Sequence, residues 1–64
     1  MADYTRQVLR LLSAAGCYFV RLGKGSHTIW FSPMTNRPFT VAAKIGNRRT
    51  ANGILKDAGM DAKV

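Results

Sequence analysis

The sequence predicts an α+β domain with the element order α-β-β-β-α, in which two helices cover one face of a three-stranded antiparallel sheet. Segments at both ends of the chain have the apolar spacing of amphipathic helices, and three short runs rich in aromatic and β-branched residues lie between them. Short connections join these runs, which favours antiparallel hairpins. The chain has 64 residues, 47% of them apolar, which is enough for one domain, residues 1–64, with a small core.

The first predicted helix lies near the N-terminus and carries one apolar stripe. The residues of the stripe, spaced i, i+4, i+7, i+8 and i+11, are Tyr4, Val8, Leu11, Leu12 and Ala15. Asp3 or Thr5 is suited to cap the start of this helix, and Gly16 is suited to end it in the left-handed conformation. Arg6 and Arg10 lie off the stripe, so the exposed face is basic, either as a solvated surface or as an RNA contact.

Three predicted strands follow the first helix. They span residues 17–22, 27–32 and 38–43. Glycines in residues 23–25 form the first turn, and residues 32–37, which include Pro33 and Asn36, form the second. Pro38 has no N–H to donate to a neighbouring strand, so we expect it at the start of its strand or on an edge of the sheet.

Alternation along the second strand assigns its side chains to two faces. His27, Ile29 and Phe31 share one face, and Thr28 and Trp30 share the other. Because Ile29 and Phe31 are the more hydrophobic set, we expect their face, and His27 at its rim, to lie under the helices.

The second predicted helix spans residues 50–58. Its apolar stripe consists of Ile54, Leu55 and Ala58. Thr50 or Asn47 is suited to be the N-cap, and Gly59 is a suitable stop. The complete element order is that of the double-stranded RNA-binding domain, which contacts the RNA minor groove through shape, 2′-hydroxyls and phosphates.

The charge of the chain favours a polyanionic partner. Ten Lys and Arg stand against three Asp, a formal net charge of +7, which suits nucleic acid, an acidic protein or an anionic membrane. The basic residues are spread along the chain and not gathered on one amphipathic helix, which disfavours membrane binding. The two helices are separated by the whole sheet, which disfavours a helix-turn-helix DNA-binding domain.

Composition also disfavours metal sites, disulfides and membrane insertion. Cys17 is the single cysteine, so we expect a buried, reduced thiol and no zinc site. The carboxylates of Asp3, Asp57 and Asp61 lie near the helix ends and form no Mg²⁺-binding cluster, so we expect neither a metal nor a cofactor. No apolar run approaches the roughly 20 residues that span a bilayer, and no signal peptide is recognisable. We therefore expect a cytoplasmic protein.

His27 is the single histidine, and it follows the turn Gly23-Lys24-Gly25-Ser26 where the second strand begins. The unperturbed pKa of imidazole lies near neutrality, so this side chain both takes and gives protons. Because Lys24 and Arg21 are close to His27 in the sequence, we predict that His27 transfers a proton during cleavage of a phosphodiester. Lys24 is the first candidate to stabilise the charge on the phosphate, and Arg21 is the second. The alternative is a turn histidine in a non-catalytic RNA-binding module.

Other residues are candidate RNA contacts. Gly23 and Gly25 are expected to supply left-handed turn conformations or to let backbone N–H groups approach a phosphate, and Ser26 to orient the imidazole or a phosphate, or simply to form the turn. Lys44, Arg48 and Arg49 lie before and at the start of the second helix, whose N–H groups also favour anions. A solvated basic loop is the alternative for these three residues.

Several runs together resemble the HicA family of bacterial toxins. They are Gly25-Ser26-His27 with Trp30 three residues on, Leu11 to Gly16, Val20-Arg21, Phe39-Thr40-Val41, and Thr50 to Met60. The similarity covers roughly residues 4–60. Two features depart from the family pattern. Residues 22–24 separate Arg21 from the motif, where many members have one residue fewer, and Asn52-Gly53 stands where a Gly-Thr pair is common.

The resemblance implies a function, a catalytic residue and a partner. HicA-like proteins are ribosome-independent mRNA endonucleases with a double-stranded-RNA-binding-type fold, and the histidine of the Gly-Ser-His motif, here His27, is their catalytic residue. A HicB-like antitoxin covers the active surface and represses the shared operon, so operator DNA is contacted only through the antitoxin complex. Tyr18 and Trp30, expected on the sheet face away from the helices, are suited to that antitoxin interface, to base stacking or to simple packing.

Overall fold

The computed structural model describes residues 3–64 and contains the five predicted elements in the predicted order. These are α1 (Thr5–Ala14), β1 (Tyr18–Leu22), β2 (His27–Ser32), β3 (Arg37–Ala42) and α2 (Arg48–Asp57). The strands form one antiparallel sheet with the order β1-β2-β3, so β1 and β3 are its edges. Pro38 lies on the edge strand β3, as expected. The predicted fold class is therefore confirmed, although α2 begins at Arg48 and not at residue 50.

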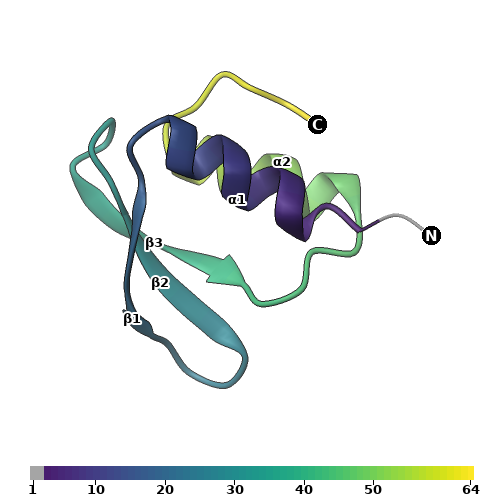
Figure 1. The fold of residues 1–64 in the computed structure, drawn as a ribbon, viewed down its shortest axis with the longest axis horizontal. Helices are drawn as coiled ribbons and strands as arrows, with labels where there is room; N and C mark the ends of the chain where they lie inside the picture. Colours follow the sequence, from purple (N-terminus) through teal and green to yellow (C-terminus); the bar gives the residue numbers. More distant parts are fainter. Residues whose placement is uncertain (1–2) are drawn as a thin grey trace.

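The two helices lie side by side, and the β1–β2 hairpin extends away from them (Figure 1). α2 packs against both β3 and α1. The buried apolar residues that join these elements are Val8, Leu12, Cys17, Phe39, Val41, Ile45, Ala51, Ile54, Leu55 and Ala58. None of them comes from β1, whose residues are all exposed. The core thus holds the helices and β3 together and leaves β1 exposed along its whole length.

The start of α1 is joined to the loop that follows β3. The N-cap of α1 is Tyr4, which makes no side-chain cap hydrogen bond, so the prediction that Asp3 or Thr5 caps this helix is wrong. Asp3 Oδ1 instead accepts the N–H of Thr5 at 2.9 Å, and the Thr5 hydroxyl accepts the N–H of Ile45 at 2.8 Å. The N–H of Tyr4 donates to the Ile45 carbonyl at 2.9 Å. Hydrogen bonds from the backbone and then the side chain of Thr5 hold the pKa of Asp3 below its ordinary value, and the charge of Lys44 acts in the same direction. These contacts fix the position of the basic loop.

The end of α1 and both ends of α2 follow the predicted capping pattern. Asn47, one of the two predicted caps, accepts the N–H of Thr50 on its side-chain oxygen at 2.7 Å. Gly16 and Gly59 follow the ends of the two helices with φ values of +94° and +82°. This is the left-handed conformation that glycine adopts at no steric cost.

Two glycines with positive φ differ in their surroundings, which leads to a stability prediction. A Cβ at Gly59 would lie 2.8 Å from Thr35 Cγ2, whereas a Cβ at Gly25 would have no atom within 4 Å. Both alanine variants bear the left-handed backbone cost of roughly 1–2 kcal/mol, but only Gly59→Ala adds a clash. We expect Gly59→Ala to lower the free energy of unfolding in urea more than Gly25→Ala does. Equal losses would contradict the close packing of Gly59 on the β2–β3 turn.

The register of the sheet reverses the predicted faces of β2. Trp30 pairs with Phe39, and Thr28 pairs with Val41. Phe39 and Val41 are buried in the core, and directly opposed residues share a face. Thr28 and Trp30 therefore lie on the side of the helices. Consistent with this position, Trp30 packs against the buried cluster.

The expectation that His27, Ile29 and Phe31 lie under the helices is therefore wrong. Two hydrogen bonds explain how the more polar set occupies the covered face. The Thr28 hydroxyl donates to the Val41 carbonyl at 3.0 Å, and Trp30 Nε1 donates to the Thr28 hydroxyl at 3.2 Å. Because these polar atoms are paired, their partial burial costs little. Hydrophobicity alone did not reveal this pairing.

Candidate functional site

The turn between β1 and β2 presents the Gly-Ser-His motif. The N–H of Gly23 donates to the His27 carbonyl at 2.9 Å, and the N–H of His27 donates to the Lys24 carbonyl at 3.3 Å. Gly25 has a φ of +65°, in the region that favours glycine. The left-handed conformation predicted for Gly25 is confirmed. The one predicted for Gly23 is wrong, because Gly23 is not among the positive-φ glycines.

Gly23 leaves space next to His27, because it has no side chain. A Cβ at Gly23 would lie 3.2 Å from Ile29 Cδ1 and 3.3 Å from the His27 carbonyl oxygen. On the other side of His27, its partner on β3 is Ala42. The imidazole therefore stands between two residues with minimal side chains, and it is exposed. A ligand can reach it from solvent without displacing another side chain.

The turn also offers backbone donors. Within residues 3–64, no protein group accepts the N–H of Gly25 or Ser26, whereas the Ser26 carbonyl accepts the N–H of Ala43 at 3.0 Å. This last bond places the end of β3 directly beside the turn, and Lys44 is the next residue along the chain. Lys24, the free N–H groups and Lys44 thus gather at one end of the sheet, next to His27. Such an arrangement favours an anion.

Arg21 lies on the same face of the sheet as His27. It pairs with Ile29, two residues from His27 on the same strand, so Arg21 and His27 are diagonal neighbours, typically about 7–8 Å apart between Cα atoms. Val20 forms a bulge just before Arg21 in β1. Bulges redirect side chains in this way at sheet edges. Arg48 and Arg49 are exposed on the first turn of α2, beyond Lys44.

The sheet face away from the helices, here called the open face, carries the candidate catalytic residue. Its residues are Tyr18, Arg21, His27, Ile29, Phe31, Pro38, Thr40 and Ala42. The Tyr18 and Phe31 rings lie with centroids 5.6 Å apart and an interplanar angle of 35°. Sequence reasoning missed Phe31 because it was assigned to the covered face. Phe31 lies an even number of residues from His27 on the same strand, and this spacing was the signal that places both side chains on one face.

Tyr18 and Trp30 do not share a surface, contrary to prediction. Tyr18 lies on the open face, as expected. Trp30 lies on the helix side, where its ring meets that of Phe19 edge-on with centroids 6.4 Å apart. The expectation that Trp30 lies on the face away from the helices is therefore wrong, and the two side chains lie on opposite faces of the sheet.

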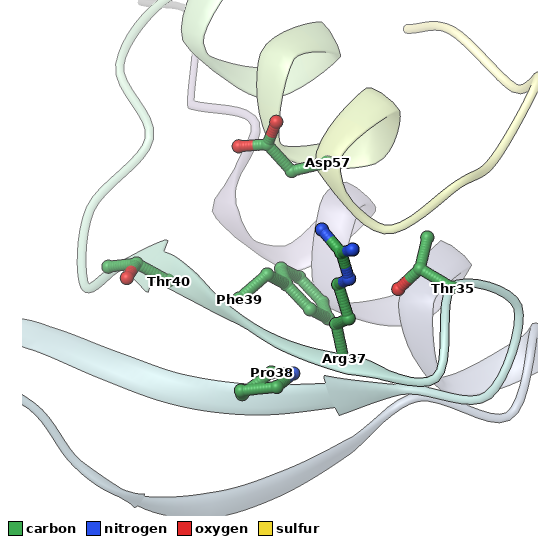
Figure 2. A pocket seen from close by; sticks show the side chains of 6 residues that line it. All are labelled: Thr35, Arg37, Pro38, Phe39, Thr40 and Asp57. Atoms are coloured by element: carbon green, nitrogen blue, oxygen red, sulfur yellow. The ribbon is translucent and has the colours of Figure 1, made fainter.

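A separate pocket lies between β3 and the end of α2 (Figure 2). It is lined by Thr35, Arg37, Pro38, Phe39, Thr40 and Asp57. The side chains of Arg37 and Asp57 point into it from opposite sides. This pocket contains none of the residues predicted for RNA binding or catalysis, and the candidate site is instead the open end of the β1–β2 hairpin.

Metal-ligand geometry and helix length give two further findings. Within residues 3–64, no three His, Cys, Asp or Glu side chains are grouped closely enough to hold a metal ion. In the same range, no helix has the length and apolar character needed to cross a membrane.

The structure is thus a small α+β domain with a Gly-Ser-His turn at one end of its sheet. The family described as HicA toxin of bacterial toxin-antitoxin matches residues 5–60, which include all five elements. The chain belongs to this HicA toxin family and is the toxin of a toxin–antitoxin system, for which the family implies a HicB-type antitoxin partner. No curated protein and no solved structure matched the chain.

Proposed function

We propose that this toxin is a metal-independent, ribosome-independent endoribonuclease that cleaves mRNA in the cytoplasm, with His27 as a general acid or base. The observation that carries the proposal is the position of the imidazole. It is exposed between Gly23 and Ala42, beside a turn that contains Lys24 and free N–H groups and that is hydrogen-bonded to Ala43, the residue before Lys44. This is a proton-transfer group next to a site suited to a phosphate.

The chemistry requires two proton transfers. The RNA 2′-hydroxyl loses its proton as its oxygen attacks phosphorus, and the 5′-oxygen gains a proton as its bond to phosphorus breaks. The products are a 2′,3′-cyclic phosphate and a free 5′-hydroxyl. One imidazole performs one of these transfers, worth roughly 10²–10⁴-fold in rate. The chain has no second histidine, so water, a lysine or a tyrosine carries the other proton.

The charge that develops on the phosphate needs donors close to His27. Lys24 and the N–H groups of Gly25 and Ser26 belong to the same turn, and Lys44 is held beside them by the Ala43–Ser26 hydrogen bond. Fixed donors of this kind stabilise a transition-state charge without further rearrangement. Arg21, Arg48 and Arg49 extend the positive surface and contact the RNA backbone on either side.

The antitoxin is proposed to cover β1. Four large apolar side chains of this edge strand are exposed: Tyr18, Phe19, Val20 and Leu22. An exposed apolar patch on an open sheet edge is typical of a protein interface. A partner on β1 would also shield Arg21 and the approach to His27, which accounts for neutralisation. Tyr18 remains a candidate contact, whereas Trp30 is better explained by packing against the core.

Controlled expression in bacteria tests the proposed function. We expect induction of the parent protein to arrest growth and fragment mRNA, and the His27→Ala variant to do neither at the same soluble level. Equal growth and intact RNA in both cultures would favour a non-catalytic RNA-binding module. Arrest and fragmentation by both proteins would show that the chemistry does not depend on His27.

A further inference from the structure

We propose that the open face binds single-stranded RNA, with the Tyr18 and Phe31 rings stacking on bases near the bond that His27 cleaves. This proposal rests on the proposed function, because His27 marks the cleavage point. The proposal adds a base-binding surface at the end of the open face that is farther from His27. It also implies that the substrate is unpaired RNA.

The order of residues along the open face determines the path that the bound RNA would follow. His27 lies at one end, then comes Ile29 with Arg21 opposite it, and then Phe31 with Tyr18 opposite it. Phe31 lies four residue steps beyond His27 along β2, which corresponds to about 13 Å. A nucleotide close in sequence to the scissile phosphate therefore reaches the aromatic pair without bending the RNA away from the sheet.

The rings of Tyr18 and Phe31 provide an aromatic surface on which a base close to the cleaved bond can stack. Tyr18 is 56% exposed, and Phe31, directly opposite it on β2, is half-buried; their ring centroids lie 5.6 Å apart. Aromatic side chains on an open sheet stack on unpaired bases, and this stacking tolerates different sequences. Bases inside a duplex are already stacked on their neighbours, so their ring faces are inaccessible. The aromatic pair therefore favours single-stranded RNA.

Charge favours RNA over a second copy of the protein as the occupant of this face. Arg21 lies between the aromatic pair and His27, where it would meet the phosphate that links the two nucleotides. The sequence has no acidic residue between Asp3 and Asp57, so no strand carries a negative charge. Two copies with a formal net charge of +7 each would repel one another across this face.

Neighbouring aromatic residues provide a matched comparison. Tyr18 and Phe19 are 56% and 50% exposed on the same strand, but they lie on opposite faces. In full-length protein that carries His27→Ala, fluorescence anisotropy with a labelled oligouridylate measures affinity without cleavage. We expect Tyr18→Leu to weaken binding roughly tenfold and Phe19→Leu to change it by no more than about twofold. Tyr18→Phe, which keeps the ring, is expected to retain binding.

Several results would overturn this proposal. They are equal losses in Tyr18→Leu and Phe19→Leu, no loss in either, tighter binding of an RNA duplex of the same length, or failure of Tyr18→Phe to retain binding. No loss in either variant would leave protein docking as the role of Tyr18. Circular dichroism confirms that each variant is folded. If the parent does not cleave RNA but Tyr18→Leu still weakens binding, the proposed nuclease function fails while the base-binding surface stands.

Discussion

Replacing His27 with alanine in the purified protein is expected to lower the rate of RNA cleavage at least about 100-fold and to leave RNA affinity within a few-fold. The imidazole supplies proton transfer, which is worth roughly 10²–10⁴ in rate, whereas the positive surface that supplies affinity remains intact. A loss confined to the chemical step separates a catalytic group from a binding group. Single-turnover cleavage and anisotropy on the same oligonucleotide measure the two quantities.

Two additions make this experiment decisive. His27→Asn retains a polar side chain of similar size but does not titrate, so it should be as inactive as His27→Ala. Each reaction is run without EDTA, with EDTA and with EDTA followed by excess Mg²⁺. We expect equal rates, because the three carboxylates belong to the start of α1, the end of α2 and the C-terminal tail and are not arranged to share a cation. Cleavage that disappears in EDTA and returns with Mg²⁺ would contradict the proposed mechanism, as would parental rates in either variant.

Local signals in the sequence predicted the order of elements well. Apolar spacing located both helices, Asn47 was one of two proposed caps, and Gly16 and Gly59 mark helix ends as expected. These features depend on a few neighbouring residues and on backbone conformation, so they are readable without tertiary information. The motif turn was predictable for the same reason, apart from the backbone conformation of Gly23.

The faces of β2 were not predictable from local signals, because register is a property of two strands together. A strand whose two faces are both hydrophobic specifies its orientation weakly. Ile29 and Phe31 are the more apolar set, but the Thr28 hydroxyl finds the Val41 carbonyl only when the sheet is assembled. This reversal moves His27 from a half-sheltered rim to the open face. The base-binding proposal follows from that position, since Phe31 and Tyr18 then share the face with His27.

The core of this protein is small, so a single cavity in it is expected to lower the free energy of unfolding by a large fraction. Leu55 in α2 is fully buried in the cluster that joins the helices and β3. Leu55→Ala removes buried methyl groups and leaves a cavity, at a cost of about 2–5 kcal/mol. A domain of this length has a total stability of about 3–10 kcal/mol. We therefore expect the variant to be largely unfolded at 37 °C or to unfold at much lower urea concentration than the parent.

Leu22→Ala is the matched control for this loss. Leu22 is 74% exposed on β1, so the same chemical change there is expected to alter the free energy of unfolding by no more than about 0.5 kcal/mol. Both substitutions are made in the His27→Ala background to avoid toxicity, and urea unfolding is followed by circular dichroism. Similar midpoints for the two variants would show that α2 does not provide the core contacts described for Leu55. A large loss for Leu55→Ala alone would mean that the contacts between the helices and β3 supply much of the stability, whereas the Leu22 side chain on the exposed strand β1 supplies little.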